Sequence, residues 1–327
     1  MIDKVIILGV RRANQLIPDH EIGQMAGRCG RSYTESGEAT LVVPEKDLDT
    51  ANEYMFGKPK PIASSMFEVE NTAFHCTPAI HYGEVYNQET FEKWYSRTLS
   101  FAQEKKISWR EVREFLLQVE CVKDTDGFVS LTDLGEISFR FYYPPDRIYW
   151  LKDKLRLIVN SGIIKEPEAI SWLLAYQHCS IGEAKADELS EYKSAVNSLG
   201  LYFHCGELTE GYAYYCMLSR RKPKWLKHKI EELKKDIERL FGALQQIARV
   251  EEIPVSNTLE VWLQCVKRKL PYELGELSLE FPDATVAQLF ELDSISVHRK
   301  RDLIKNKHKV ECYCSESLRK YLNGISL

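Results

Sequence analysis

The longest amphipathic pattern in the chain runs from Lys224 to Arg249. Apolar residues recur there three and four positions apart, which places them on one face of a helix and predicts that this face is buried. They are Leu226, Ile230, Leu233, Ile237, Leu240, Leu244 and Ile247. The opposite face is predicted to display His228, Lys235, Arg239 and Gln246, with Glu232 and Gly242 among them. An ordinary surface helix and a helix that holds a ligand on its polar face both fit this pattern.

The first sixty residues contain two strand-like runs, residues 4–10 and 38–44. Between them, Asp19 is placed to cap a helix, and residues 46–57 are predicted to form another helix that ends at Gly57. Two strands do not make a stable sheet by themselves. We therefore expect this segment to complete a sheet whose other strands lie elsewhere.

Helices dominate the pattern after residue 60. They are expected near residues 68–82 and 88–105, and then a helix, a short hairpin and a second helix are expected between Trp109 and Tyr143. The hairpin turn is predicted at residues 124–127, where the sequence is Asp-Thr-Asp-Gly. Thr132 or Asp133 is placed to cap the helix that follows.

Residues 146–220 are also predicted to be mostly helical, with breaks at Gly162, Gly182, Gly200 and Gly206. The residues expected in the core of this region are Trp150, Leu151, Leu155, Ile158, Trp172, Leu173, Leu174 and Tyr176. The expected fold class is therefore a multi-domain, mainly α protein that begins with a partial α/β segment.

The composition is that of a globular protein of two or three domains, with 327 residues, 44% of them hydrophobic and 28% charged. No apolar run approaches the roughly 18 residues of a membrane-spanning helix, so no membrane partner is expected. The nine cysteines are odd in number and irregularly spaced. They predict free thiols in a reducing, intracellular compartment, with a cytoplasmic or nucleoid-associated location.

Basic residues are concentrated in two segments, although the net charge is −4. Residues 220–239 hold nine Lys or Arg against four Asp or Glu, and residues 297–309 hold six against one. Such runs are usually solvated faces, but local charge decides binding to phosphates more than the sum does.

No metal site is predicted. Histidine and cysteine are neighbours at residues 75–76, 178–179 and 204–205, without the spacing of zinc ligands. Cys312 and Cys314 with His308 are more suggestive, yet they still fit buried thiols better.

The densest chemical motif is Gln24-Met25-Ala26-Gly27-Arg28-Cys29-Gly30-Arg31. A guanidinium group binds phosphate oxygens bidentately and stabilises charge that develops on a γ-phosphate. Glycine beside each arginine lets the backbone approach that phosphate. The alternative interpretation is a basic helix end with a glycine cap.

This motif resembles motif VI of superfamily 2 helicases, in the form found in the Ski2-like branch. Other segments follow in the order found in Ski2-like DNA helicases of the archaeal Hjm type. They are residues 5–9 (VIILG), 16–18 (LIP), 37–43 (GEATLVV), 54–61 (YMFGKPKP), 98–103 (TLSFAQ), 131–135 (LTDLG) and 142–145 (YYPP).

The resemblance implies four domains. Residues 1–60 would be the C-terminal part of a second RecA-like domain, and residues 61–145 linker helices and a winged helix. Residues 146–255 would form a helical ratchet domain, and residues 256–327 a helix-hairpin-helix-like module. In the family the winged helix mainly braces the neighbouring domains, and we favour that role over direct reading of bases.

The resemblance also implies a function, ATP-driven 3′-to-5′ translocation on DNA and unwinding for DNA repair. Arg28 and Arg31 would be the catalytic arginines, and Gln24, Gly27 and Gly30 would contact ATP. The sequence contains neither a G-x-x-x-x-G-K-[ST] phosphate loop nor a D-E-x-H box for magnesium. ATP and Mg²⁺ are therefore expected to bind through an N-terminal helicase half that carries the phosphate loop. The chain would then be a truncated protein, one product of a split gene or a degenerate paralogue.

Single-stranded or forked DNA is the expected nucleic-acid partner, and RNA remains an alternative because Ski2-like enzymes use both. The resemblance places the ratchet helix at residues 224–249, with Arg239 at the position of the family's base-stacking aromatic residue and Glu232 at that of a basic residue. In the last module, the basic residues Arg299, Lys300 and Arg301 would face phosphates, and the alternative is a protein-contact module with a solvated basic face. The rival hypothesis is a non-catalytic nucleic-acid-binding or scaffold protein derived from a helicase.

Overall fold

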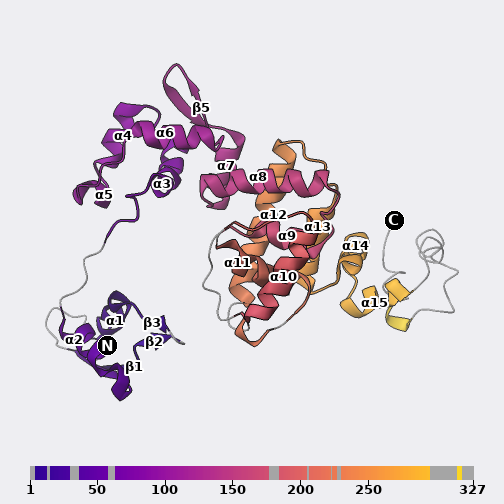
Figure 1. Cartoon of the computed structure of the whole chain (residues 1–327), viewed down its shortest axis with the longest axis horizontal. Coiled ribbons are helices and arrows are strands. Elements are labelled where there is room, and N and C mark those ends of the chain that lie inside the picture. Colours follow the sequence, from indigo (N-terminus) through magenta and orange to yellow (C-terminus); the bar gives the residue numbers. More distant parts are fainter. Residues whose placement is uncertain are drawn as a thin grey trace. The chain divides into compact units, whose positions relative to one another are not determined.

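The computed structural model describes residues 4–12, 15–29, 37–57, 63–176, 184–204, 206–221, 223–226, 230–294 and 315–318. These residues form a mainly helical protein with small sheets, as the hydrophobic pattern predicts. The chain divides into two compact units, Met1–Ser64 (unit 1) and Ser65–Leu327 (unit 2) (Figure 1). Among the described helices, none has both the length and the apolar composition that crossing a membrane requires.

Unit 1 is a small α/β unit. Strand β1 (Lys4–Leu8) pairs in parallel with β4 (Glu38–Val42), in register from Lys4 opposite Glu38 to Leu8 opposite Val42. Its other elements are the short antiparallel pair β2 (Arg11–Arg12) and β3 (Gln15–Leu16), the helices α1 (Asp19–Ala26) and α2 (Leu48–Phe56), and the 3-10 turn η1 (Glu45–Asp47). The two predicted strands and both predicted helices are confirmed.

The predicted cap of α1 is wrong by one residue. Pro18 occupies the N-cap position and has no side chain with which to accept a hydrogen bond. Asp19 is the first helical residue, and its carboxylate accepts a hydrogen bond from the backbone N–H of His20 at 2.8 Å. A negative charge in the first turn still favours the helix, because the N-terminal end of the helix dipole is positive.

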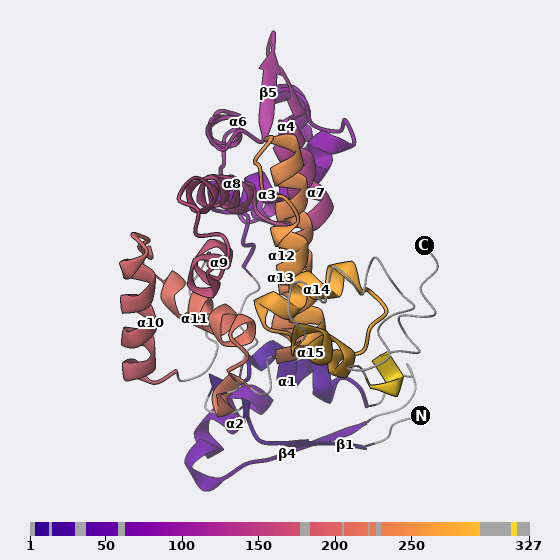
Figure 2. The same ribbon diagram turned by 90° about the vertical axis from the view of Figure 1, so that its right-hand side faces the viewer.

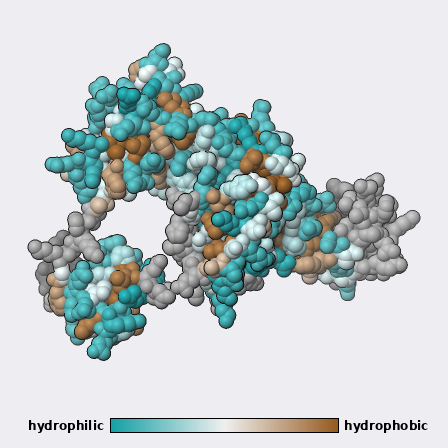
Figure 3. Space-filling view, viewed as in Figure 1, coloured by the Kyte–Doolittle hydropathy of each residue, from teal (hydrophilic) through white to brown (hydrophobic). Residues whose placement is uncertain are grey.

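The core of unit 1 lies on one face of the β1–β4 sheet. Ile7 of β1 is buried there against Ile17 and against Ile22 of α1. Successive residues of a strand point to opposite faces, so Ile6 and Leu8 point to the other face, where they are 67% and 79% exposed. Figure 3 shows hydrophobic residues on the visible surface of this unit.

Unit 2 begins with helices and one hairpin. The helices are α3 (Val69–His81), α4 (Gln88–Tyr95), α5 (Leu99–Ala102), α6 (Trp109–Gln118) and α7 (Asp133–Phe141), and the strands β5 (Val122–Thr125) and β6 (Phe128–Leu131) stand between α6 and α7. The hairpin is confirmed, and Thr132 caps α7 by accepting a hydrogen bond from the N–H of Gly135. The single helix predicted over residues 88–105 is interrupted, because Thr98 starts a new helix as its N-cap.

The second part of unit 2 is helical throughout its described residues. Its elements are α8 (Pro145–Asn160), α9 (Pro167–Leu174), α10 (Ala186–Ser198), α11 (Glu207–Leu218), η2 (Lys224–Leu226), α12 (Ile230–Val250), α13 (Thr258–Arg268), α14 (Tyr272–Glu280) and α15 (Val286–Ser294). Gly162, Gly200 and Gly206 stand between helices with positive φ, as breaks require. Gly182 lies outside the described residues.

The predicted long helix is α12, and it packs against α7, α8, α11 and α13 (Figure 2). Its predicted apolar stripe is confirmed from Leu233 to Ile247, and the buried surface is wider than the stripe because Phe241 and Ala243 are also fully buried. One continuous apolar core runs from α3 to α13, and a smaller one begins at Leu270 and includes residues of α14 and α15.

Trp150 is the predicted core residue that the structure leaves exposed, and Tyr176, also predicted in the core, is only half-buried. The Trp150 side chain is 43% exposed and its ring lies 5.5 Å from that of His204, centroid to centroid. Leu151, Leu155 and Ile158 are buried as predicted. Trp150 lies one position before this buried series, so its side chain emerges at the border of the apolar face.

Candidate functional site

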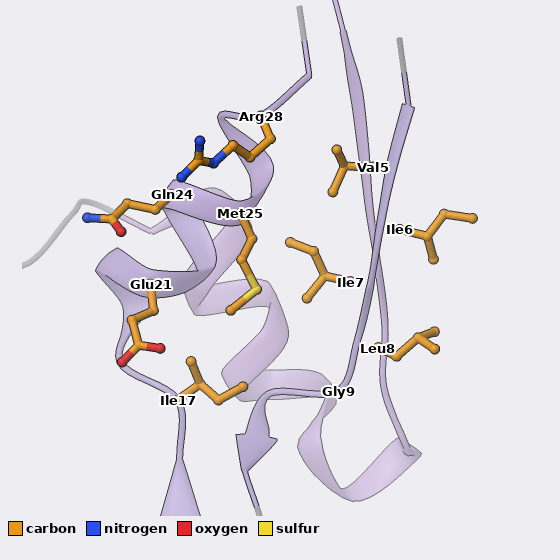
Figure 4. Close-up of a pocket in the computed structure, with 10 residues that line it drawn as sticks. All are labelled: Val5, Ile6, Ile7, Leu8, Gly9, Ile17, Glu21, Gln24, Met25 and Arg28. Atoms are coloured by element: carbon orange, nitrogen blue, oxygen red, sulfur yellow. The ribbon is translucent and has the colours of Figure 1, made fainter. Parts of the chain in front are cut away.

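A pocket in unit 1 runs along the edge of β1 that β4 does not occupy. Five consecutive residues from Val5 to Gly9 line it together with Ile17, and α1 contributes Glu21, Gln24, Met25 and Arg28 (Figure 4). In this view Val5 and Ile7 point toward α1, whereas Ile6 and Leu8 point away from it. The motif that begins at Gln24 therefore borders a strand edge with which no other strand of the described residues pairs.

Gln24, Gly27 and Arg28 are all exposed at the C-terminal end of α1. Arg28 has no carboxylate partner among the described residues. By contrast, Arg11 pairs with Asp47 at 2.9 Å and Arg12 pairs with Glu21 at 2.9 Å. Gly30 and Arg31, which the motif also includes, lie outside the described residues.

Gly27 is the C-cap of α1, but its backbone does not require glycine. Its φ of −69° and ψ of 6° are open to any L-residue, unlike the left-handed conformation of most glycine caps. A methyl group at this position would meet the carbonyl oxygen of Gly23 at 3.3 Å, a tight but adjustable contact. The glycine-cap interpretation therefore explains little of why glycine is present here.

The open face of α12 is narrower than the sequence predicts. Lys235 and Arg239 are exposed, and Gln246 is half-buried. Gly242, predicted on the polar face, packs against α7, because a methyl group there would come within 2.8 Å of the ring of Phe141. His228 and the side chain of Glu232 lie outside what the structure describes.

Arg239 is held by its neighbours even though 44% of its side chain is exposed. Its Nε donates a hydrogen bond to the hydroxyl of Tyr143 at 2.9 Å, and its Nη2 pairs with Asp236 at 2.8 Å. Its guanidinium carbon lies 4.2 Å from the centre of the Tyr143 ring. Lys235 is therefore the more available of the two predicted cations.

A buried charge network joins α8, α11 and α12, and Arg239 is linked to it through Asp236. Arg147 of α8 pairs with Glu210 of α11 at 3.6 Å and with Asp236 of α12 at 4.0 Å. The Tyr214 hydroxyl lies 3.1 Å from Glu210 and 2.8 Å from Asp236. Burial opposes ionisation of Asp236, but Arg147 and three donated hydrogen bonds hold its pKa below the usual 3.8. The network fixes the three helices to one another.

Sequence reasoning missed this network. Its members are spread over ninety residues and follow no motif spacing. The one available signal was Tyr143, within the segment Tyr-Tyr-Pro-Pro that the family resemblance includes. Its hydroxyl lies 2.9 Å from Asp236, so this tyrosine fastens the end of α7 to α12.

The helix before the hairpin has its arginines paired with carboxylates. Arg110 of α6 pairs with Glu114 at 2.8 Å, and Arg113 pairs with Asp124 of the hairpin at 2.5 Å. The hairpin turn adds a second acid, Asp126. This surface is therefore poorly suited to phosphates, which repel carboxylates and need free cations.

The described residues contain no group of three or more His, Cys, Asp or Glu side chains placed to hold a metal ion. Arg299, Lys300 and Arg301 lie outside the described residues, as do His308, Cys312 and Cys314. Comparison of the sequence with models of protein families finds no match, and no curated protein matches it significantly.

Proposed function

We propose that this chain supplies the arginine-bearing and strand-binding half of a Ski2-like, ATP-dependent 3′-to-5′ DNA helicase. The observation that carries the proposal is the exposed end of α1, where Gln24, Gly27 and Arg28 lie beside an open edge of a parallel sheet. Parallel sheets in α/β proteins are covered on both faces and extended by further strands. A second segment that adds strands at β1 would bring its nucleotide close to Arg28.

The chemistry assigned to these residues follows from their donors. Arg28, and Arg31 after it in the motif, would stabilise the charge that develops on the γ-phosphate during hydrolysis. Gln24 would orient the phosphate or the attacking water through its amide, and Gly27 and Gly30 would allow close backbone approach. The phosphate loop and the magnesium ligands would come from the other helicase half, so ATP and Mg²⁺ bind between the two.

Unit 2 would hold the nucleic acid. Lys235 and Arg239 are exposed on α12, and the basic segment at residues 297–309 adds charge after α15. The helices and hairpin from α3 to α7 would act as the winged helix of the family in its bracing role. Their paired arginines and acidic turn support bracing rather than base reading. Single-stranded DNA is the proposed ligand, and RNA is the alternative.

A non-catalytic scaffold derived from a helicase is the second candidate. The observation in its favour is that Arg239 is already paired with Asp236. This pairing lowers the affinity that the guanidinium group can have for phosphate. The open edge of β1 and the exposed face of the β1–β4 sheet would then bind a protein without nucleotide. The two candidates differ in one measurable property, nucleotide turnover that depends on Arg28.

The test combines this chain with a helicase half that carries a phosphate loop, sought among neighbouring genes, and measures ATP hydrolysis with single-stranded DNA. Arg28→Ala should lower turnover about 10³-fold, the scale of an arginine finger. Arg12→Ala is the matched control, since Arg12 lies in the same unit but pairs with Glu21; its turnover should stay within about twofold of the parent. A loss at Arg28 of less than about tenfold would leave the scaffold ahead.

A further inference from the structure

Helix α15 has one buried side and one exposed side. Leu289 and Leu292 point into the small core that α15 shares with α14, where they are 0% and 1% exposed. Val286 and Phe290 are 40% and 48% exposed. Residues four positions apart lie on the same side of a helix. These two side chains therefore form an apolar stripe that packing within the described residues leaves open.

The other flank of α15 is already covered. The side-chain amide of Gln288 donates hydrogen bonds to the carbonyl and the hydroxyl oxygens of Ser317, each at 3.0 Å. The carboxylate of Glu291 accepts a hydrogen bond from the hydroxyl of Ser315 at 2.6 Å. Residues 315–318 thus lie against the side of α15 that carries Gln288 and Glu291, and the stripe of Val286 and Phe290 is on the side that remains.

The surface next to this stripe is acidic. Residues 271–294, which include α14 and α15, contain six Asp or Glu and no Lys or Arg. On α14, Glu273, Glu276 and Glu280 recur at helical spacing, and all three are exposed. Asp283 is exposed in the turn between the helices. It is three residues before Val286, so their Cα atoms are at most about 11 Å apart.

Cations from other helices meet this surface, but they are engaged there. Lys165 pairs with Glu276 at 2.9 Å, and Arg268 of α13 donates a hydrogen bond to the hydroxyl of Ser278 at 2.6 Å. Glu280 and Asp283 have no cationic partner within 4.0 Å among the described residues. The α14 end of the stripe therefore carries carboxylates that remain available to a cation.

An apolar stripe bordered by such carboxylates selects its partner by charge. Nucleic acids and anionic membranes present phosphates, which these carboxylates repel. A protein segment with lysines or arginines beside apolar residues satisfies both features. Because Val286 and Phe290 lie along one side of a helix, the segment that fits them is itself a helix with one apolar face.

We infer that the exposed side of α15 docks a basic amphipathic helix of a partner protein. Val286 and Phe290 contact its apolar face, and Glu280 and Asp283 face its lysines or arginines. The inference goes beyond the proposed function, because it gives the last module a protein-binding role that needs neither nucleotide nor nucleic acid. Phe290 is the expected anchor, since buried aromatic residues contribute most to the affinity of an interface.

The test uses a labelled peptide of leucine and lysine, about 14 residues long so that it forms roughly four helical turns, with its leucines on one face. Fluorescence anisotropy measures its binding to the whole chain. Phe290→Ser should weaken binding about tenfold, the scale of an interface anchor. Glu280→Gln combined with Asp283→Asn should weaken binding at low salt, and its affinity should approach that of the parent at about 0.5 M salt, where charges are screened.

Three controls make the result specific. Phe290→Leu keeps an apolar side chain and should retain most of the affinity. Leu157→Ser removes an apolar side chain that is 47% exposed on α8 and should bind like the parent. A peptide of the same composition with its leucines spread around the helix should bind more weakly than the amphipathic one. Thermal unfolding of Phe290→Ser should match that of the parent, because this side chain is 48% exposed.

Equal affinity of Phe290→Ser and the parent for the amphipathic peptide would overturn the docking face. Equal binding of the two peptides would overturn it as well, because charge alone would then explain the affinity. A parent protein that does not bind the peptide at low salt would have the same consequence. If Phe290→Ser instead lost affinity for oligo-dT, the face would belong to nucleic acid. The helicase proposal is judged separately, by turnover that depends on Arg28.

Discussion

The sheet of unit 1 and the helical core of unit 2 bury their apolar residues to very different extents. In β1 of unit 1, the side chain of Ile7 is buried, whereas those of Ile6 and Leu8 are more than 60% exposed. In unit 2, α12 buries apolar residues on every side that meets another helix. Both segments carry large apolar residues, Ile6 and Leu8 in β1 and Leu240 in α12 among them, so the difference lies in how many partners each element has within the described residues.

This difference in burial predicts that the two units differ in whether they are stable without a partner. A two-stranded parallel sheet with one covered face buries too little apolar surface to be stable without further support. The large core of unit 2 needs no such support. We therefore expect unit 1 to gain stability and function together when a partner covers its open face and edge, whereas unit 2 should fold and bind its ligand independently.

The largest expected effect tests this separation directly. Leu240 is fully buried in α12, and Leu240→Ala should lower the free energy of unfolding of unit 2 by about 2–5 kcal/mol. Ile22→Ala, the matched change in unit 1, should leave the unfolding of unit 2 unchanged. All six tryptophans lie in unit 2, from Trp94 to Trp262, so tryptophan fluorescence during urea denaturation reports that unit alone. A shift in this transition in Ile22→Ala would show that the units unfold together.

Much of this fold follows from the sequence. Three- and four-residue spacing predicts α12 because an amphipathic helix must bury one face, and the Asp-Thr-Asp-Gly turn predicts the β5–β6 hairpin. Periodicity fails where a helix has several neighbours. Gly242 falls on the polar side of the helical pattern, yet the ring of Phe141 packs there. Which neighbours surround a helix is a property of the tertiary fold, which local spacing does not contain.

The candidate sites divide in the same way. The motif around Arg28 was predictable because its residues are consecutive, so a glycine–arginine pattern is visible in the sequence itself. The network of Arg147, Glu210 and Asp236 was not, because residues distant in sequence meet only after folding.

The buried charge network of unit 2 should make its stability depend on pH in the acid range. Asp236→Asn removes the charge that Arg147 and Arg239 contact, and should cost about 1–3 kcal/mol at pH 7. The folded pKa of Asp236 lies below its ordinary value of 3.8. Its ionised form therefore stabilises the fold fully above pH 3.8, and this contribution disappears as the pH falls through the folded pKa.

Urea denaturation between pH 3 and 7 should show the free energies of unfolding of the parent and the variant converging at the acid end. Parallel curves across this range would contradict the assigned role, and Asp153→Asn, a partly exposed site, should differ little from the parent at any pH.

A smaller effect is expected on the surface of unit 2. Lys235→Glu should lower the slope of log affinity against log salt by about 0.7, the value for one phosphate contact with a single strand. Stability should change by less than about 0.5 kcal/mol, because the side chain is exposed. Lys193→Glu on α10 carries the same charge change at another exposed site and should leave the slope nearly unchanged. Equal slopes for both variants would mean that α12 does not contact phosphates and that long-range charge alone governs binding.

At the open edge of unit 1, adding one methyl group to Gly27 should change the structure very little. Gly27→Ala fits the observed backbone, with one contact at 3.3 Å to adjust, so the stability of unit 1 should change by no more than about 1 kcal/mol. Gly23→Ala is the control, because a methyl group there meets no atom within 4 Å and replaces glycine inside a helix, which should stabilise α1 by about 0.5–1 kcal/mol.

Far-UV circular dichroism measures the stability of both variants, and ATP hydrolysis with the phosphate-loop half measures their function. If Gly27 permits close approach of a phosphate, Gly27→Ala should lose turnover while Gly23→Ala keeps it. Full turnover in both variants would mean that the nucleotide contacts Arg28 without approaching the backbone of α1 at Gly27.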